Sequence, residues 1–242
     1  MWRDSALCET PAMPDLGFDG LHLYEQMLLL MLDDEKGTFD KRAQVSLTLV
    51  AAADAELFLS GRLGLAPKGS TSVVRVEDPM PTRDPVLDAC LEVIATGRRA
   101  APLHAWIPRQ SRIRRLRGMA AESLASRGIV RVDEHAVLGI FPTRRYPEVE
   151  GGPEADLIAA LETAVFTDTD DVDRRVRLLV SLADANGILR RRYGRARMRE
   201  RSRRIEQLTS EIAIGAALKR AIDEVNATLA SVATTSAVAA GS

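Results

Sequence analysis

The stretch Leu21-His-Leu-Tyr-Glu-Gln-Met-Leu-Leu-Leu-Met-Leu32 decides the fold. Its apolar residues lie on nearly every side of a helix rather than along one stripe, which is typical of a helix that is buried all round. The polar run Asp33-Asp34-Glu35-Lys36-Gly37 follows, and Gly37 suits the position just after a helix end. The sequence therefore predicts a deeply buried helix over residues 21–32.

The rest of the chain also favours helices. Hydrophobic residues make up 46% of the 242 residues and aromatic residues only 4%, and Ala and Leu, which favour helix, are abundant. Asp84 is a good N-cap before Pro85, and apolar residues then recur at helical spacing as far as Gly97. The other expected helices span residues 41–60, 110–127, 153–166, 173–186, 199–208 and 211–232.

Strands are few and short. Residues 72–76 read as one short strand, and residues 61–64 as a loop. Ile129 to Val132 and Ala136 to Phe141 predict a β-hairpin that turns at residues 133–135.

Together these elements predict a mainly α protein, in which a single globular helical domain carries a β-hairpin and minor short strands. We expect this domain to span residues 21–232, because no linker is long enough to divide it. Residues 1–20 and 233–242 are expected to be flexible tails, since small, polar and helix-breaking residues dominate them.

Several classes of protein are disfavoured by the sequence. A membrane-spanning helix needs about 20 apolar residues, and the longest apolar stretch here, residues 27–32, is far shorter. Pro11, Pro14 and Asp15 interrupt any secretory signal, so a cytoplasmic location is expected. Cys8 and Cys90 are too few for a disulfide framework. No catalytic motif, metal cluster or cofactor fingerprint is present, so neither an enzyme nor a metal or cofactor is expected.

The clearest charge feature is the segment from Arg98 to Arg117. It carries arginines at positions 98, 99, 109, 112, 114, 115 and 117 together with His104, and the next carboxylate is Glu122. The formal net charge of the chain is −1, so a positive surface depends on this segregation of charge rather than on an overall excess.

Two arginines of this segment suggest a phosphate site. On the expected helix 110–127, Arg117 lies at the edge of the apolar stripe, and Arg114 lies one turn back on the same side. Two guanidinium groups three residues apart can hold one phosphate by bidentate hydrogen bonds. The alternative is a solvated basic face that pairs with nearby acidic residues.

A second basic run extends from Arg190 to Arg204, with nine arginines and only one acid, Glu200. It is either an exposed helix that pairs with the acidic stretches or a patch for lipid headgroups or nucleic acid.

Five blocks of the sequence, in order along residues 21–230, resemble one family. The blocks are Leu28-Leu-Leu-Met-Leu-Asp-Asp-Glu-Lys-Gly37, Glu56-Leu-Phe-Leu-Ser-Gly-Arg-Leu63, Leu124-Ala-Ser-Arg-Gly-Ile-Val130, Leu138-Gly-Ile-Phe-Pro-Thr-Arg-Arg-Tyr-Pro147 and Asp173-Arg-Arg-Val-Arg-Leu-Leu-Val-Ser-Leu-Ala183. They resemble the Golgi phosphoprotein 3 family of peripheral membrane proteins, in particular its bacterial members. The resemblance implies a mostly helical domain with a flat basic face. Eukaryotic members bind phosphatidylinositol 4-phosphate on Golgi membranes and act as adaptors for glycosyltransferases.

The resemblance also implies residue roles. The lipid pocket of eukaryotic members uses a tryptophan, an arginine on the second helix and an arginine pair, and the pair falls on Arg114 and Arg117 here. The tryptophan position falls near Lys41, and the helix-two arginine near Val50, so Lys41 or Arg42 would supply charge but no aromatic wall.

A hairpin helps members of the family to form oligomers. Its counterparts here are Val132, Val137, Leu138, Ile140 and Phe141. An equally open interpretation is an ordinary hairpin that covers its own core.

We therefore expect a peripheral membrane protein on the inner face of the membrane that binds anionic phospholipid headgroups. Protein clients are a further expectation. One alternative is a nucleic-acid-binding module, because a helix at 110–127 followed by a hairpin is similar to the end of a winged helix. The net charge makes nucleic acid the less expected partner. The other alternative is an adaptor that binds proteins only.

Overall fold

The computed structural model describes residues 20–32, 45–69, 71–137, 141–147 and 152–210, together with residues 149 and 227. Over these residues the chain is mainly α-helical, as the sequence predicts, and it carries two short antiparallel hairpins. Apart from residue 227, the expected helix over 211–232 lies outside this part of the chain, as do the tail 233–242 and nearly all of the tail 1–20.

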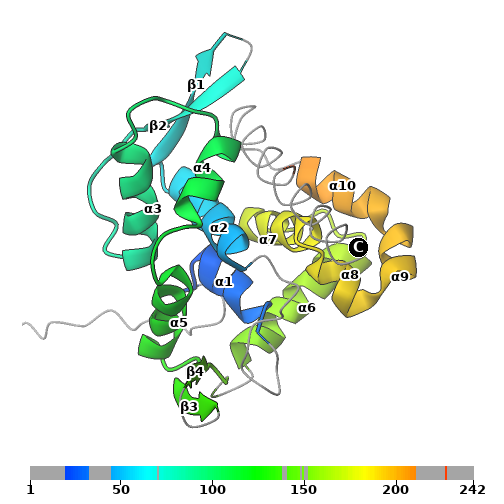
Figure 1. The fold of residues 1–242 in the computed structure, drawn as a ribbon. Helices are drawn as coiled ribbons and strands as arrows, with labels where there is room; N and C mark the ends of the chain where they lie inside the picture. The colour runs from blue at the N-terminus through cyan, green and yellow to red at the C-terminus, as the bar shows by residue number, and fades with distance from the viewer. Residues whose placement is uncertain are drawn as a thin grey trace, which may run out of the picture.

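The centre of the molecule is a pair of helices, α1 (Leu23–Leu29) and α2 (Val45–Leu59). Every residue of α1 is buried, which confirms the prediction drawn from its all-round apolar pattern. Figure 1 shows α1 and α2 in the middle, with the helices of residues 85–126 on one side of them and those of residues 152–210 on the other. The buried side chains of all these layers belong to one continuous core.

The helix α3 (Pro85–Ala95) confirms the start predicted at Asp84 and Pro85. The Asp84 carboxylate accepts hydrogen bonds from the backbone amides of Val86 and Leu87, at 2.9 and 2.8 Å. The local sequence alone determines this helix start, because the cap and its acceptors lie within three residues.

The first hairpin joins β1 (Leu63–Lys68) to β2 (Thr71–Val76). Strand β2 was predicted, but the interpretation of residues 61–64 as a loop was wrong, since Leu63 and Gly64 pair with Val76 and Arg75. The pairing partner makes β1 a strand, although its own sequence contains Gly and Pro.

The second hairpin joins β3 (Asp133–Val137) to β4 (Phe141–Arg145), with Val137 opposite Phe141. The prediction of a hairpin is confirmed, but its bounds were wrong. Residues 133–135, expected to form the turn, instead belong to the first strand. Figure 1 shows this hairpin at the lower edge of the molecule, next to α5.

The expected single helix over 110–127 is also wrong in its bounds. Two helices occupy this region, α4 (Leu103–Gln110) and α5 (Leu116–Ser126), and residues 111–115 form a turn between them. Arg115 adopts a left-handed conformation with φ of 63° at the start of α5. Arg114 therefore lies in the turn and does not share a helix with Arg117.

The remaining helices close the opposite side of the core. The predicted helix over 153–166 corresponds to α6 (Gly152–Phe166). The acidic run over residues 168–173 ends at Asp173, which caps α7 (Arg174–Ala185) by accepting a hydrogen bond from the Arg175 amide at 2.7 Å. The last three helices of this side are α8 (Ile188–Tyr193), α9 (Arg195–Glu200) and α10 (Ser202–Ser210).

Candidate functional site

The segment from Arg98 to Arg117 forms a surface of exposed arginines around α4, the following turn and the start of α5. All seven of its arginines are exposed, and we call them the basic surface: Arg98, Arg99, Arg109, Arg112, Arg114, Arg115 and Arg117. The apolar side chains of the same elements face the core, where Trp106, Ile107 and Leu116 are buried. Burial of these three residues therefore directs the intervening arginines to solvent.

Trp106 anchors this surface to the core. It is 2% exposed, and its indole nitrogen donates to the backbone carbonyl of Ala101 at 3.0 Å. A Cβ atom placed on Gly97 would lie 2.1 Å from the indole ring, so only glycine fits there. The Arg109 guanidinium lies 4.8 Å from the centre of the Trp106 ring. The tryptophan thus holds the loop and α4 together.

Arg114 and Arg117 are both exposed, one in the turn and the other in the first turn of α5. Within the described part of the chain, neither of them forms an ion pair with a carboxylate. Arg117 instead donates through Nε to the Ser46 hydroxyl at 3.0 Å. This bond places Arg117 beside the start of α2, a few residues after Lys41 and Arg42 in the sequence. Lys41 and Arg42 themselves lie outside the described residues.

Arg115 is the arginine of the basic surface that pairs with a carboxylate among the described residues. Its guanidinium pairs with the Glu122 carboxylate at 2.7 Å, and both side chains are largely exposed. This pair agrees with the alternative of a basic face neutralised by nearby acids, but only for this one arginine. Exposed ion pairs contribute about 0–1 kcal/mol to stability, so the pair has a small effect on the fold.

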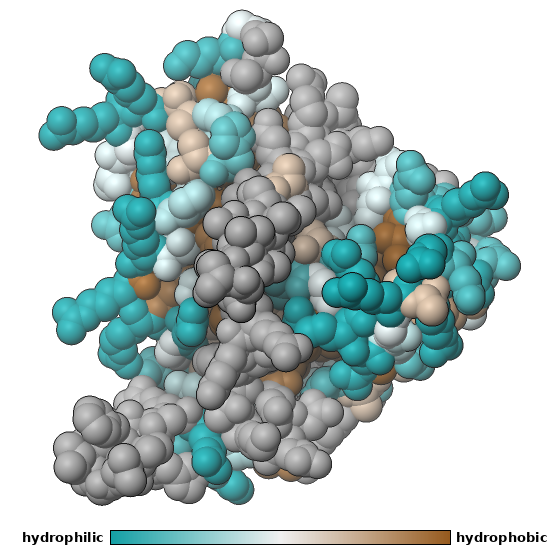
Figure 2. All heavy atoms as spheres, turned by 45° about the vertical axis from the view of Figure 1, so that its right-hand side comes forward, coloured by the Kyte–Doolittle hydropathy of each residue, from teal (hydrophilic) through white to brown (hydrophobic). Residues whose placement is uncertain are grey.

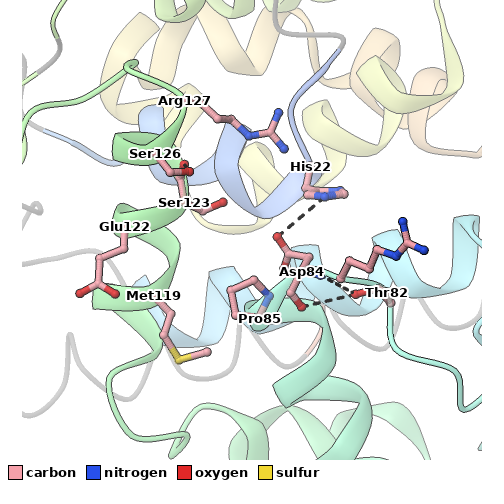
Figure 3. Close-up of a pocket in the computed structure, with 10 residues that line it drawn as sticks. His22, Thr82, Asp84, Pro85, Met119, Glu122, Ser123, Ser126 and Arg127 are labelled. Carbon is pink, nitrogen blue, oxygen red and sulfur yellow. Dashed lines mark hydrogen bonds and ion pairs between the residues drawn. The ribbon is translucent and has the colours of Figure 1, made fainter.

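A hollow of about 480 Å³ lies on another face of α5, between its last turns and the start of α3. Figure 3 shows His22, Asp84, Ser123 and Arg127 around it. Neither Arg114 nor Arg117 lines this hollow. The sequence gives no sign of this hollow, because its walls come from three separate segments of the chain and no local pattern joins them.

The polar groups of the hollow are linked to one another. The Tyr24 hydroxyl donates to Asp84 at 2.5 Å, and His22 lies between Glu56 and Asp84, at 3.9 and 3.8 Å from their carboxylate oxygens. Burial alone would lower the pKa of His22. The hydrogen bond to Glu56 and the negative charges of Glu56, Asp84 and Glu25 outweigh this effect and raise the pKa above 6.5.

Ion pairs between half-buried arginines and buried carboxylates complete the network. Arg175 donates to both carboxylate oxygens of Glu56, at 2.9 and 2.7 Å, and Arg127 lies 3.2 Å from the fully buried Glu25. These contacts join α7 and the end of α5 to the central helices. Because the charges of these groups are already matched, we interpret the network as structural.

Among the described residues, no group of three or more His, Cys, Asp or Glu side chains could hold a metal ion. Cys90 is buried, and burial raises the pKa of its thiol. This thiol therefore packs as a small apolar group.

The hairpin residues expected to support self-association are only partly described. Val132 is half-buried and packs against the core. Val137 and Phe141 form the strand pair nearest the turn of the hairpin, but their side chains lie outside the described part of the structure. Leu138 and Ile140 lie outside the described residues altogether. Self-association through this hairpin stays a prediction.

Comparison with protein families places this chain. A family model described as Golgi phosphoprotein 3 (GPP34) matches residues 23–225. A search of curated proteins found no match. The matched range includes all five sequence blocks on which the resemblance rests, and it contains the basic surface.

Proposed function

This chain belongs to the Golgi phosphoprotein 3 family, and from that premise we propose that it is a peripheral membrane protein that binds anionic phospholipid headgroups through its basic surface. No helix in the described part of the chain is long and apolar enough to cross a bilayer. The proposal places the protein on the inner, cytoplasmic face of the membrane. It also includes an adaptor role, in which a lipid-bound molecule presents client proteins at that surface.

The observation that carries the proposal is the exposed, largely unneutralised charge of the basic surface. All seven arginines are exposed, and within the described residues only Arg115 pairs with a carboxylate. A basic residue near an anionic leaflet contributes about 1 kcal/mol to binding. Several arginines on neighbouring elements therefore supply enough attraction for reversible attachment without any inserted apolar segment.

We assign the headgroup phosphate to Arg114 and Arg117, with Lys41 and Arg42 as further sources of charge. Arginine suits this role because its planar guanidinium donates two parallel hydrogen bonds to a phosphate. The bond from Arg117 to Ser46 supports a site shared with the segment that leads into α2.

The family resemblance names phosphatidylinositol 4-phosphate as the headgroup. Two features of the family pocket are missing here, since the tryptophan position falls near Lys41 and the helix-two arginine near Val50. Val50 is fully buried in the core, so it contributes nothing to a surface site. We therefore expect recognition of anionic charge with weaker discrimination among phosphoinositides than the complete pocket would give.

The test is vesicle flotation with the Arg114→Ala, Arg117→Ala double variant. Vesicles of phosphatidylcholine alone are compared with vesicles that also contain phosphatidylserine, phosphatidylinositol or phosphatidylinositol 4-phosphate. The wild-type chain should float only with anionic vesicles, and the double variant should lose about tenfold or more in binding.

The matched control is Arg195→Ala with Arg199→Ala, which removes the same charge from α9. These two arginines are exposed, and this control should bind vesicles as the wild type does. Equal binding by the wild type and the Arg114, Arg117 variant would show that the headgroup site is elsewhere. Equal loss in both variants would show that total charge, rather than this surface, determines the attachment.

A further inference from the structure

The second arginine-rich run forms three short helices, α8 to α10, which we call the arginine lobe. Figure 1 shows the lobe at the far side of the molecule from α5, and Figure 2 shows hydrophilic side chains over it. Seven of its nine arginines are exposed: Arg190, Arg191, Arg192, Arg195, Arg197, Arg199 and Arg203. A second basic surface therefore exists, separate from the one assigned to the membrane.

The two other arginines hold the lobe in place. Arg204 is buried, and its Nε donates to the backbone carbonyl of Ala164 at 3.0 Å. Arg201 pairs with Asp168 at 3.2 Å and donates to the backbone carbonyl of Phe166 at 2.5 Å. Docking against the end of α6 thus explains these two side chains, and Arg192 and Arg197 also contact α6, through an ion pair with Glu154 at 3.6 Å and through the Phe166 ring.

The charge of the exposed set is only partly matched. Arg192 pairs with the Glu154 carboxylate at 3.6 Å, and Arg190 and Arg191 donate to backbone carbonyls at the end of α7. Arg195, Arg199 and Arg203 have no carboxylate partner among the described residues. Nothing in the packing of the lobe requires these three charges, so they are available to a partner.

The arrangement of the arginines does not suit a flat partner. Arg190, Arg191 and Arg192 are consecutive on α8 and all exposed. Successive helical residues point about 100° apart, so the three side chains project in different directions. A planar membrane would meet only part of such a surface, whereas a flexible polyanion can follow it around the helices.

The lobe also lacks side chains that could enter a bilayer. Its large apolar residues Met198, Ile205 and Leu208 are buried in the core. The exposed large hydrophobic residues found in the described part of the chain, Met80 and Val149, lie in other segments. The lobe therefore offers a partner only its exposed charge, and it is the spread of its arginines around the helices that favours a flexible polyanion over a flat membrane.

The side-chain chemistry suits phosphates and bases. The run from residue 190 to 204 has nine arginines and no lysine, and guanidinium groups bind phosphate bidentately and stack on planar rings. Arg197 shows such stacking, 3.9 Å from the centre of the Phe166 ring on α6 and 5.8 Å from that of Tyr193 on α8. We propose that the arginine lobe binds the phosphate backbone of single-stranded nucleic acid.

The test measures binding of fluorescent oligo-uridylate and oligo-thymidylate of about 20 nucleotides by anisotropy, between about 50 and 200 mM salt. The lobe variant carries Arg195→Ala, Arg199→Ala and Arg203→Ala. Each phosphate contact to a single strand contributes about 0.7 to the slope of log affinity against log salt. Loss of three contacts should therefore reduce the slope by about two and the affinity by roughly tenfold at low salt.

The control variant removes equal charge from the basic surface through Arg98→Ala, Arg99→Ala and Arg112→Ala, and it should bind the strands within about twofold of the wild type. Far-UV circular dichroism and thermal melting confirm that both variants fold. The proposal fails if the wild type does not bind either strand, or if both variants lose affinity equally. It also fails if the lobe variant loses binding to phosphatidylserine vesicles while it keeps the strands, since the lobe would then be a membrane contact. These results are independent of the headgroup site at Arg114 and Arg117.

Discussion

Asp54 is a carboxyl group placed in the middle of the core. It is fully buried on α2, and its Oδ1 accepts a hydrogen bond from the Gln110 side-chain amide at 2.7 Å. Within the described part of the chain, Asp54 Oδ2 and Gln110 Oε1 are both buried without a hydrogen-bond partner. Burial raises the pKa of Asp54 to about 8, although the bond from Gln110 acts in the opposite direction. A proton on Oδ2 would let Asp54 donate a hydrogen bond, whereas the ionised form leaves both of these oxygen acceptors without a donor.

This carboxyl predicts a fall in stability as the pH rises. The folded-state pKa lies above the unfolded value of 3.8, so the stabilisation is complete below that value and is lost progressively up to about pH 8. Each pKa unit corresponds to about 1.4 kcal/mol, so the change amounts to several kcal/mol. Asp54→Asn, which supplies a donor and an acceptor at every pH, should raise the free energy of unfolding at pH 7 and remove this pH dependence in urea titrations.

Asp156→Asn is the matched control, because Asp156 is exposed on α6. The control should keep the wild-type pH dependence. If Asp54→Asn unfolds with the same pH dependence as the wild type, Asp54 is ionised in the folded protein and the interpretation is wrong.

The pKa of Glu56 is shifted in the opposite direction to that of Asp54. Burial would raise the pKa of Glu56, but hydrogen bonds from His22, Arg175 and the Leu23 amide, with the charge of Arg175, lower it to about 2. Its stabilising effect is therefore present above the ordinary value of 4.5 and is lost as the pH falls towards 2.

Glu56→Gln should lower the free energy of unfolding at pH 7 by about 2–3 kcal/mol, because the charged hydrogen bonds to Arg175 are weakened. The loss of stability between pH 4.5 and 2 should also shrink. Glu92→Gln, an exposed change on α3, should alter neither quantity. An unchanged acid transition in Glu56→Gln would contradict the lowered pKa.

At the scale of elements, we predict that the β3–β4 hairpin contacts a second copy of the chain. The described sheet has only two strands, so each strand has one edge without a pairing partner within it. Such edges, with apolar residues at their tips, favour strand addition. The sequence places Val132, Val137, Leu138, Ile140 and Phe141 in and around this hairpin.

Val137→Asp should therefore shift the protein towards monomer in light scattering coupled to size exclusion. The charge would oppose close approach of a second hairpin. Met80→Asp places the same change on an exposed apolar residue outside the hairpin and should leave the mass unchanged. A wild-type chain that elutes as a monomer at high micromolar concentration would refute self-association through this element.

At the scale of the whole molecule, the net charge of −1 conceals two separated basic surfaces. The basic surface lies around α4 and α5, and the arginine lobe lies at the far side, as Figure 1 shows for the elements. Attraction between exposed charges is screened within about 10 Å at 0.1 M salt and about 3 Å at 1 M. The proposed attachment to membranes therefore depends on charge that is open to salt.

Vesicle binding should accordingly fall steeply as salt increases, and flotation across a salt series measures it. The reason is that salt in the solvent screens the attraction between the exposed arginines and the anionic headgroups, and no described apolar segment is positioned to insert into the bilayer. Binding that persists near 1 M salt would indicate hydrophobic insertion and would contradict the electrostatic proposal.

Much of the fold was predictable because its signals are local. The buried helix α1 follows from the apolar pattern of its own residues, and the start of α3 follows from Asp84 and Pro85. The helices α6 and α7 follow in the same way from apolar spacing and the Asp173 cap. The exposure of the basic surface was also predictable, since arginines without nearby carboxylates remain in solvent.

The sequence by itself thus determined a mainly helical core, two arginine-rich segments and membership of the family. Only the tertiary structure decided that the chain turns at residues 111–115 instead of continuing as one helix. The apolar spacing of residues 110–127 suits one continuous helix, yet Gln110 is held by Asp54 on another helix, and the chain turns before Leu116 enters the core. Contacts between residues more than fifty positions apart outweigh local helix propensity there, and no local pattern reports them.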